Sequence, residues 1–317
     1  MKGRITLVLL GMVAVGQEAA AQAHLTNEQR FQVGSVEMSL GVGLLNGKSH
    51  EKVYDEGEKL SQLKWDLKQV PTLHLGLAYY PLNWLSLEAR GWTQIAKGNG
   101  HMKDYDWMNG EDEDWTHYSD HPDTRVQKAW QAEVGATAWA LKLENLALGV
   151  MLGYQRSELG WRSRGGRFNY SSDDGFRDLV GQFPAGLKTI TYEQTYQTPY
   201  VGLVALYTWR DWTLEGRFKH SQWVKASDYD QHHLRNLTFA GNNGNSGRMQ
   251  SLAVGLGWQI NPAFSIEADI DYQVYAEAKG SMRVNDLSSG ETSYYSGDVG
   301  SQSSRTVVSS LAVNYRF

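Results

Sequence analysis

The stretch FSIEADIDYQV, residues 264–274, alternates apolar and polar side chains. Successive side chains of a β-strand point to opposite faces, so this period of two predicts a strand with one face in an apolar medium and the other in a polar one. Three carboxylates on the polar face would be rare in a strand buried within a soluble sandwich. The stretch therefore favours the wall of a membrane barrel. Its apolar face is Phe264, Ile266, Ala268, Ile270, Tyr272 and Val274, and its carboxylates are Glu267, Asp269 and Asp271.

The same alternation recurs along the chain, and the connections between the alternating segments have two lengths. Short connectors alternate with long polar ones, which predicts ten strands. An even number of antiparallel strands with this pattern is typical of outer-membrane proteins. The fold class predicted is therefore all-β, a ten-stranded antiparallel transmembrane β-barrel with long extracellular loops and short periplasmic turns; a soluble two-sheet sandwich is the alternative. The short connectors are 80–84, 142–145, 209–212 and 260–263, and the long ones lie near 46–60, 98–125, 163–189, 226–247 and 278–303.

Aromatic residues and the two chain ends support this interpretation. An interfacial aromatic girdle is expected at the strand ends by the short turns. Residues 1–23 read as a signal peptide, cleaved near Ala21 or Ala23, which leaves residues 24–317 as a single barrel domain in the bacterial outer membrane. The chain ends in LAVNYRF, with a terminal aromatic residue on its apolar face. The girdle residues are Tyr79, Tyr80, Trp84, Trp209, Trp212 and Trp258.

Composition excludes several functions. The chain has no cysteine, so thiol catalysis and thiolate metal sites are excluded. Its formal net charge is −5, which argues against a nucleic-acid partner. A ten-stranded barrel is narrow, and charge pairs and water are expected to fill it, so passive conduction is the weaker hypothesis. The expected interior charges are Glu37, Glu133, Glu215, Arg217, Lys219, Glu267, Asp269 and Asp271.

Two acidic motifs lie in the second and fourth long connectors. Asp104 and Asp106 are two residues apart, so in an extended segment their side chains share one side and each raises the other's proton affinity. Asp230 and His232 repeat this spacing, and a carboxylate beside an imidazole suits a general base. Each motif alone is more often a solvated loop. A calcium loop at DYDWMNG fails, because Asn109 stands where glycine is needed.

Longer blocks make the chain resemble the omptin family of outer-membrane endoproteases, which includes the plasminogen activator type. The resemblance covers essentially the whole mature sequence. It implies that Asp104 with Asp106, and Asp230 with His232, hold a water that attacks the scissile bond, without metal or acyl-enzyme. The blocks are GKSHEKVYDEGEKLSQLKWD (47–66), DYDWMN (104–109), HPDT (121–124), RGGRFNYSSDDGFRD (164–178), YVGLVALY (200–207) and SQWVKASDYDQH (221–232).

The resemblance also implies the substrate. Cleavage is expected after Arg or Lys in cationic peptides or proteins, with the basic side chain held by Glu51 and Asp228 and with Met102 lining the same pocket. His117 stands where some members have an acid that contacts the residue after the cleaved bond. A strict preference for two consecutive basic residues is therefore not expected.

The family further implies a dependence on lipopolysaccharide, recognised by outward-facing residues just above the membrane. Tyr154 matches the family pattern, whereas Arg156 and Glu158 occur in the reverse sign order and Thr195 stands where Arg is expected. Arg248 is an alternative contact. No other cofactor and no metal are expected, and the protein is expected to be a monomer with its active site facing the exterior. Two other functions stay open: a catalytically silent adhesin or invasin acting through its loops, and a narrow channel.

Overall fold

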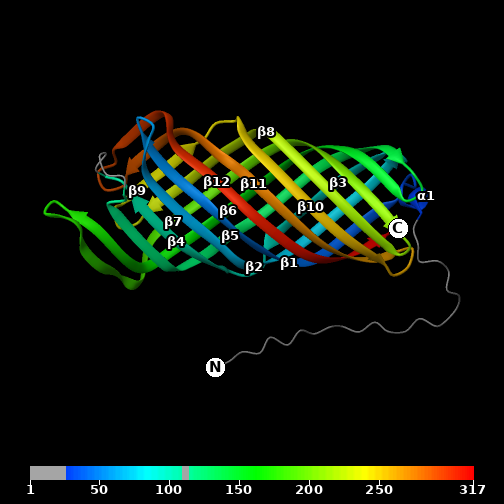
Figure 1. Cartoon of the computed structure of the whole chain (residues 1–317), viewed down its shortest axis with the longest axis horizontal. Coiled ribbons are helices and arrows are strands. Elements are labelled where there is room, and N and C mark those ends of the chain that lie inside the picture. Colours follow the sequence, from blue (N-terminus) through cyan, green and yellow to red (C-terminus); the bar gives the residue numbers. More distant parts are fainter. Residues whose placement is uncertain (1–25, 109–113) are drawn as a thin grey trace, which may run out of the picture.

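The computed structural model describes residues 26–108 and 114–317, and the expected signal peptide lies outside them. This part of the chain forms one tilted β-barrel with a single-turn helix at one end (Figure 1). No helix in the described ranges is long and apolar enough to span a membrane. The elements are α1 (Asn27–Arg30), β1 (Val36–Asp55), β2 (Glu58–Leu82), β3 (Leu85–Gln94), β4 (Gly98–Asp106), β5 (His117–Lys142), β6 (Leu146–Ser172), β7 (Gly175–Trp209), β8 (Trp212–His232), β9 (Leu237–Asn242), β10 (Gly247–Gln259), β11 (Phe264–Asp286) and β12 (Thr292–Arg316).

The sheet closes on itself, because β1 pairs antiparallel with both β2 and β12. Twelve strands are described where the pattern predicts ten. The difference is small: β3 and β4 both pair with β2 and β5, and β9 and β10 both pair with β8 and β11. Each of these pairs is therefore one barrel strand broken once. The first break lies opposite Pro71, which has no backbone N–H to donate across the ladder.

The two faces of the wall have the expected polarity. Outward-facing Leu252, Val254 and Ile270 are 55, 49 and 56% exposed, as lipid-facing residues of a barrel should be. Inside, Lys219 Nζ lies 2.7 Å from Glu133 Oε2, and a guanidinium nitrogen of Arg217 lies 2.7 Å from a carboxylate oxygen of Asp269. The prediction of charge pairs inside the barrel is confirmed.

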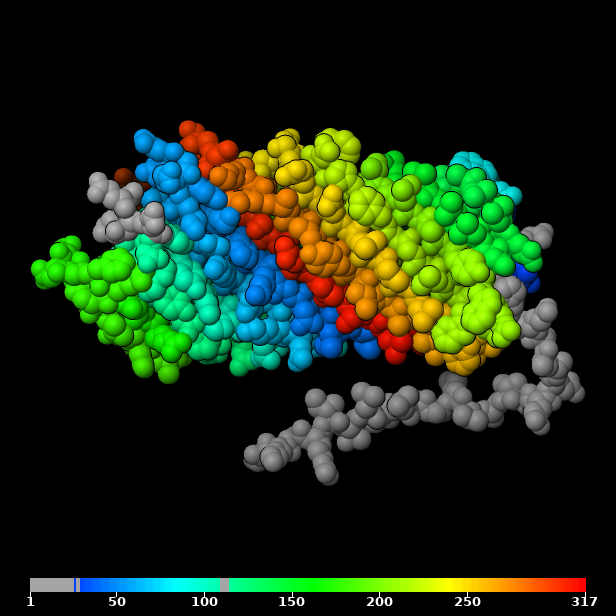
Figure 2. Space-filling model, viewed as in Figure 1, coloured from blue at the N-terminus to red at the C-terminus, as the bar shows by residue number. Residues whose placement is uncertain are grey.

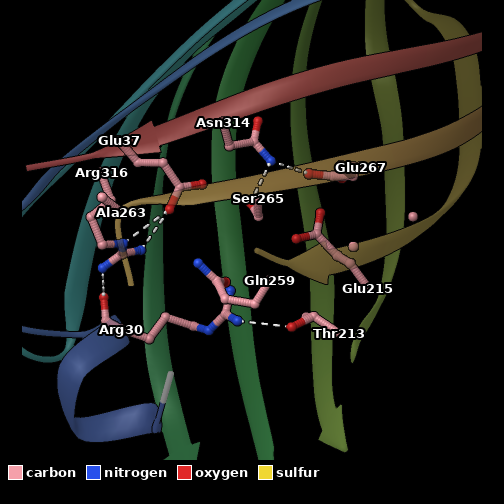
Figure 3. A pocket seen from close by; sticks show the side chains of 12 residues that line it. Arg30, Glu37, Thr213, Glu215, Gln259, Ala263, Ser265, Glu267, Asn314 and Arg316 are labelled. Atoms are coloured by element: carbon pink, nitrogen blue, oxygen red, sulfur yellow. Dashed lines mark hydrogen bonds and ion pairs between the residues drawn. The ribbon is translucent and has the colours of Figure 1, made fainter. Parts of the chain in front are cut away.

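One end of the barrel, the turn end, carries the short connections and is closed by the N-terminal segment. The Phe31 ring is buried and lies 4.8 Å from that of Trp139 and 6.0 Å from that of Tyr80. Tyr80 was predicted in the outer girdle and this is wrong: it follows outward-facing Tyr79, so it points inward. Figure 3 shows the polar contacts beside this closure, where Arg316 donates to Glu37 at 2.7 Å and to the carbonyl of Arg30 at 2.5 Å.

The opposite end, the hairpin end, carries the long connections. A strand needs about 9–11 residues to cross a bilayer, whereas β7 has 35 residues. Most of the long polar segments predicted as loops therefore continue the strands as paired hairpins. The hairpin joining β6 and β7 projects furthest in Figures 1 and 2, where it is green. A raised, hydrogen-bonded rim is thus available to hold side chains in fixed positions.

Candidate active site

A cleft of about 410 Å³ opens at the hairpin end. All four predicted catalytic residues line it, although they come from β4 and β8, which are not neighbours in the sheet. Glu51 lines the same cleft, whereas Asp228 and Met102 lie just outside its lining. The barrel therefore brings together two motifs that stand more than a hundred residues apart in the chain. The four residues are Asp104, Asp106, Asp230 and His232.

Two rows of residues cross neighbouring strands along one wall of this cleft. Backbone pairing sets both rows, because residues directly opposite in adjacent strands point to the same face of the sheet. The lower row contains Asp104 and the upper row, nearer the hairpin tips, contains Asp106. From β1 to β7, the lower row is Glu51, Leu63, Asp104, Ser119, Phe168 and Gly181, and the upper row is Val53, Ser61, Asp106, His117, Tyr170 and Leu179.

Asp104 and Asp106 are neighbours on one face of β4, as their spacing predicts. Burial raises the pKa of Asp104 well above its usual range, and the charges of Asp106 and Asp230 raise it further. Burial also raises the pKa of Asp106, while the nearby His232 and His117 lower it. A proton is therefore held more firmly on Asp104. Its Oδ1 is buried and has no hydrogen-bond partner among residues 26–108 and 114–317.

Asp230 and His232 form the second couple, near the end of β8. His232 Nε2 lies 2.7 Å from Asp230 Oδ2, so the carboxylate orients the imidazole. The ring of Phe239 meets the imidazole edge-on at 5.2 Å. Asp230 is buried, and its second oxygen lacks a partner within the described part of the chain. Within residues 26–108 and 114–317, the contact with Asp230 orients the imidazole through Nε2, and Nδ1 is the nitrogen that remains for proton transfer.

Glu51 and Asp228 share one acidic region with these couples. Burial raises the pKa of Glu51 well above its usual range, helped by the charges of Asp230, Asp228 and Asp104. Burial raises the pKa of Asp228 to about 7, even though Asn243 donates to one oxygen at 3.0 Å and Tyr192 to the other at 3.2 Å. Crowded, desolvated carboxylates favour a cation between them.

Met102 is fully buried beside this acidic region. It pairs across the sheet with Trp65 and belongs to a hydrophobic cluster that includes Trp161 and Tyr192. The rings of Trp65 and Tyr192 stack at 5.3 Å. This cluster gives the acidic region an apolar floor.

The predicted lipopolysaccharide residues lie on the outer surface, away from the cleft. Tyr154, Arg156 and Glu158 follow the apolar outward series of β6, and Arg156 lies 2.7 Å from Glu158. Glu158 also accepts from Lys128 of β5 at 2.9 Å. Arg248 occupies the corresponding place above the apolar series of β10, but β7 and β8 separate it from β6. The structure does not bring Arg248 to the other three.

Other residues of the cleft were not singled out from the sequence. His121 is buried, contacts Ser119 Oγ at 2.9 Å and the carbonyl oxygen of Gly165 at 2.5 Å, and stacks on Phe183 at 5.4 Å. Tyr170 and Arg235 also line the cleft. The spacing FNY at 168–170 was a usable signal, because it puts two aromatic rings on one strand face.

Within the described residues, no group of three or more His, Asp or Glu side chains is arranged to hold a metal ion. The cleft instead brings together carboxyl groups and an imidazole, which are side chains that can take up and release protons.

Comparison with known proteins points in the same direction. Residues 32–317 match the omptin family. The plasminogen activator of Yersinia pestis is 34% identical, with 100% of this chain and 99% of that protein covered. The outer membrane protease OmpP of Escherichia coli is 35% identical, covering 93% and 90%. The crystal structure of the outer membrane protease OmpT from Escherichia coli superimposes with a TM-score of 0.86 at 30% identity, covering 89% of this chain and 97% of that one.

Proposed function

Because this chain belongs to the omptin family and is an outer-membrane endopeptidase, we propose that it cleaves peptide bonds after Arg or Lys with a water activated by His232. The observation that carries the proposal is the 2.7 Å contact of His232 with Asp230, in one cleft with Asp104 and Asp106. The hairpin end, with this cleft, faces the exterior.

The proposed reaction has two proton transfers. His232 takes a proton from the water as the water oxygen attacks the carbonyl carbon, and Asp230 stabilises the resulting imidazolium. Asp104, whose pKa is raised, donates a hydrogen bond to the developing oxyanion. His232 then returns its proton to the nitrogen as the C–N bond breaks, which gives a carboxylic acid and an amine. The scheme uses neither a metal nor a covalent acyl-enzyme.

The proposed specificity follows from the acidic region. A guanidinium or ammonium group placed between Glu51 and Asp228 gives the buried Oε2 of Glu51 a partner that it lacks in the described residues. The hydrophobic cluster around Met102 gives these acids an apolar surrounding, which suits the aliphatic stem of Arg or Lys. Cationic peptides and proteins are therefore the proposed substrates.

The test is peptide hydrolysis by refolded protein with lipopolysaccharide present. His232→Ala and Asp104→Asn should each lower kcat by about 10²–10⁴-fold. The double variant should be little worse than the more damaging single one, because the residues act as a unit. Asp173→Asn, an exposed acid in the β6–β7 turn, is the matched control.

Two outcomes would contradict the mechanism: near-parental turnover by a correctly folded His232→Ala protein, or an activity that EDTA abolishes and zinc restores. Binding of host proteins by a parent that cleaves no peptide would support the adhesin hypothesis instead. Single-channel conductance of the parent in a planar bilayer would address the channel hypothesis.

We also propose that this protein is a monomer and that its activity depends on lipopolysaccharide. Arg156 is 48% exposed by side chain and Lys128 44%, and both lie directly above the outward apolar series of their strands. Cations at this height suit the phosphates of the lipid. Arg156→Ala should raise the lipopolysaccharide concentration needed for half-maximal activity, whereas activity without lipid, unchanged by its addition, would contradict the dependence.

A further inference from the structure

Five rings form a continuous wall along one side of the cleft. The Tyr170 ring lies 4.9 Å from His117 and stacks on Phe168 at 4.7 Å. Phe168 in turn lies 5.1 Å from Phe183, which stacks on His121 at 5.4 Å. We call these five residues the aromatic wall. Tyr170, Phe183 and His121 line the cleft directly.

The backbone register places the aromatic wall opposite the acids that are proposed to hold the basic side chain. In the lower row, Glu51 lies two strands from Asp104 in one direction and Phe168 lies two strands from it in the other. Neighbouring strands are about 4.8 Å apart, so each lies roughly 10 Å from Asp104. A peptide crossing Asp104 therefore meets acids on one side and rings on the other.

The electrostatic surroundings also change along the rows, from acidic near Glu51 to less acidic at the aromatic wall. Glu51 is affected by Asp230, Asp228 and Asp104, which makes this part of the cleft acidic. Beyond Asp106, the next residue in the upper row is His117, followed by Tyr170. Burial raises the pKa of Tyr170 to about 12, with Asp104 and Asp106 adding to the rise, so its phenol stays neutral. The wall offers the rings of Phe168 and Phe183 and the neutral phenol of Tyr170 beside the reacting atoms.

A glycine opposite the wall allows its central ring to lie flat across the β6–β7 hairpin. Gly181 pairs with Phe168, and a Cβ at Gly181 would come within 2.4 Å of the Phe168 ring. Any other residue at 181 would push that ring toward the cleft or out of it. The hairpin is thus shaped to present Phe168 between Tyr170 and Phe183.

We propose that the aromatic wall is a substrate subsite that takes an apolar or aromatic side chain from one of the first two residues after the cleaved bond. This inference rests on the proposed cleavage after Arg or Lys. Half-buried ring faces favour apolar side chains by dispersion and area burial. An acidic side chain there would instead be repelled by Asp106, which pairs directly with His117 of the wall.

The test uses quenched fluorescent peptides with one Arg, in which the two residues after it are Leu or Phe, Gly, or Asp. We expect kcat/KM for the Leu and Phe peptides to exceed that for the Gly peptides by about tenfold or more, since an apolar pocket discriminates by about 10–200-fold. Asp peptides should be cleaved least.

Three variants then assign the preference to the wall. In Phe168→Ala and Phe183→Ala, the ratio of kcat/KM between Phe and Gly peptides should fall by about tenfold. Gly181→Ala should lower the same ratio without removing a ring. Phe176→Ala, an exposed ring on the same hairpin that does not line the cleft, is the control and should keep the parental ratio. Far-UV circular dichroism would check each fold.

The failure of this inference is distinguishable from the failure of the proposed function. A parent that cleaves after Arg with equal efficiency for Leu, Gly and Asp peptides overturns the subsite alone. So does an unchanged ratio in folded Phe168→Ala and Gly181→Ala proteins. A parent that cleaves none of the Arg peptides, or cleaves them elsewhere, overturns the proposed function instead.

Discussion

At the scale of single residues, the site depends on carboxyl groups whose charged forms are disfavoured. Asp104, Glu51 and Asp228 all have raised pKa values, with burial as the largest cause. The consequences differ by role. A proton on Asp104 helps an oxyanion, whereas a proton on Asp228 removes the charge that attracts a basic substrate.

Substrate affinity should therefore depend on pH through Asp228. Its pKa of about 7 means that a large fraction is neutral at pH 6 and that the carboxylate dominates at pH 8. Since only the carboxylate attracts a cation, KM for Arg peptides should fall as pH rises through about 7. Asp228→Asn should flatten this part of the KM profile and weaken binding by about 2–5 kcal/mol.

The measurement is KM against pH for the parent, Asp228→Asn, and the exposed control Asp173→Asn. A parental KM that stays constant from pH 6 to 8, or an Asp228→Asn protein that binds Arg peptides as well as the parent, would show that Asp228 does not hold the basic side chain.

At the scale of elements, the outward face of β10 distinguishes the membrane segment from the rim. Leu256, which is 46% exposed, lies in the apolar outward series, and Gln250 lies on the same face nearer the hairpin end. Leu256→Arg should cost about 2–4 kcal/mol of folding free energy, because it places a charge in the apolar outward series that faces the lipid. The matched change Gln250→Arg should cost about 0–1 kcal/mol, because charges near the interface stay hydrated.

Urea unfolding in lipid vesicles, followed by tryptophan fluorescence, would measure both costs. Equal costs for the two variants would mean that residues 250–256 do not cross the hydrocarbon layer.

Most of the element structure could be predicted from the period of two. It predicted the wall at residues 264–274, and the i, i+2 spacing predicted that Asp230 and His232 share a face, where they lie 2.7 Å apart. The break between β3 and β4 was missed, because it depends on Pro71 of the neighbouring strand rather than on the broken strand itself. Tyr80 was wrongly predicted in the girdle because it was grouped with the other aromatic residues near the short turns. Strict alternation after outward-facing Tyr79 would have predicted that it points inward.

The aromatic wall could not be predicted in the same way. Its members come from β5, β6 and β7, and the β6–β7 register shifts between Arg162 and Arg164 and again between Arg164 and Gly166. Each shift changes which residues lie opposite one another. Alternation within one strand indicates which way a ring points, but the pairing across irregular strands decides which rings meet.

At the scale of the whole molecule, ion pairs inside the lumen join strands that are not neighbours in the wall. Lys219 of β8 and Glu133 of β5 come from strands separated by β6 and β7, and both side chains are only 5% exposed. Tyr200 donates to the same carboxylate at 2.6 Å. The two charges neutralise each other inside the barrel, and Lys219 also donates to Gln155 at 3.0 Å.

Breaking this pair should destabilise the barrel strongly. Lys219→Met leaves Glu133 buried without its cation, which typically costs about 3–5 kcal/mol. The double variant Lys219→Met with Glu133→Gln should recover most of that loss, because no charge is then stranded. The measurement is the free energy of unfolding in detergent micelles. A double variant no more stable than Lys219→Met would contradict this account.

The seam between β1 and β12 has a consequence for the order of folding. Arg316 donates to Glu37 across 279 residues of chain. The pairing of β1 with β12 therefore cannot form until the last strand has been made. Such a contact carries a large loop-closure entropy, and high contact order slows folding. Until β12 pairs with β1, the backbone N–H and C=O groups at both edges of the incomplete sheet lack partners. A chain that loses its final strand is thus left with two open edges, which makes it prone to aggregate rather than merely shorter by one strand.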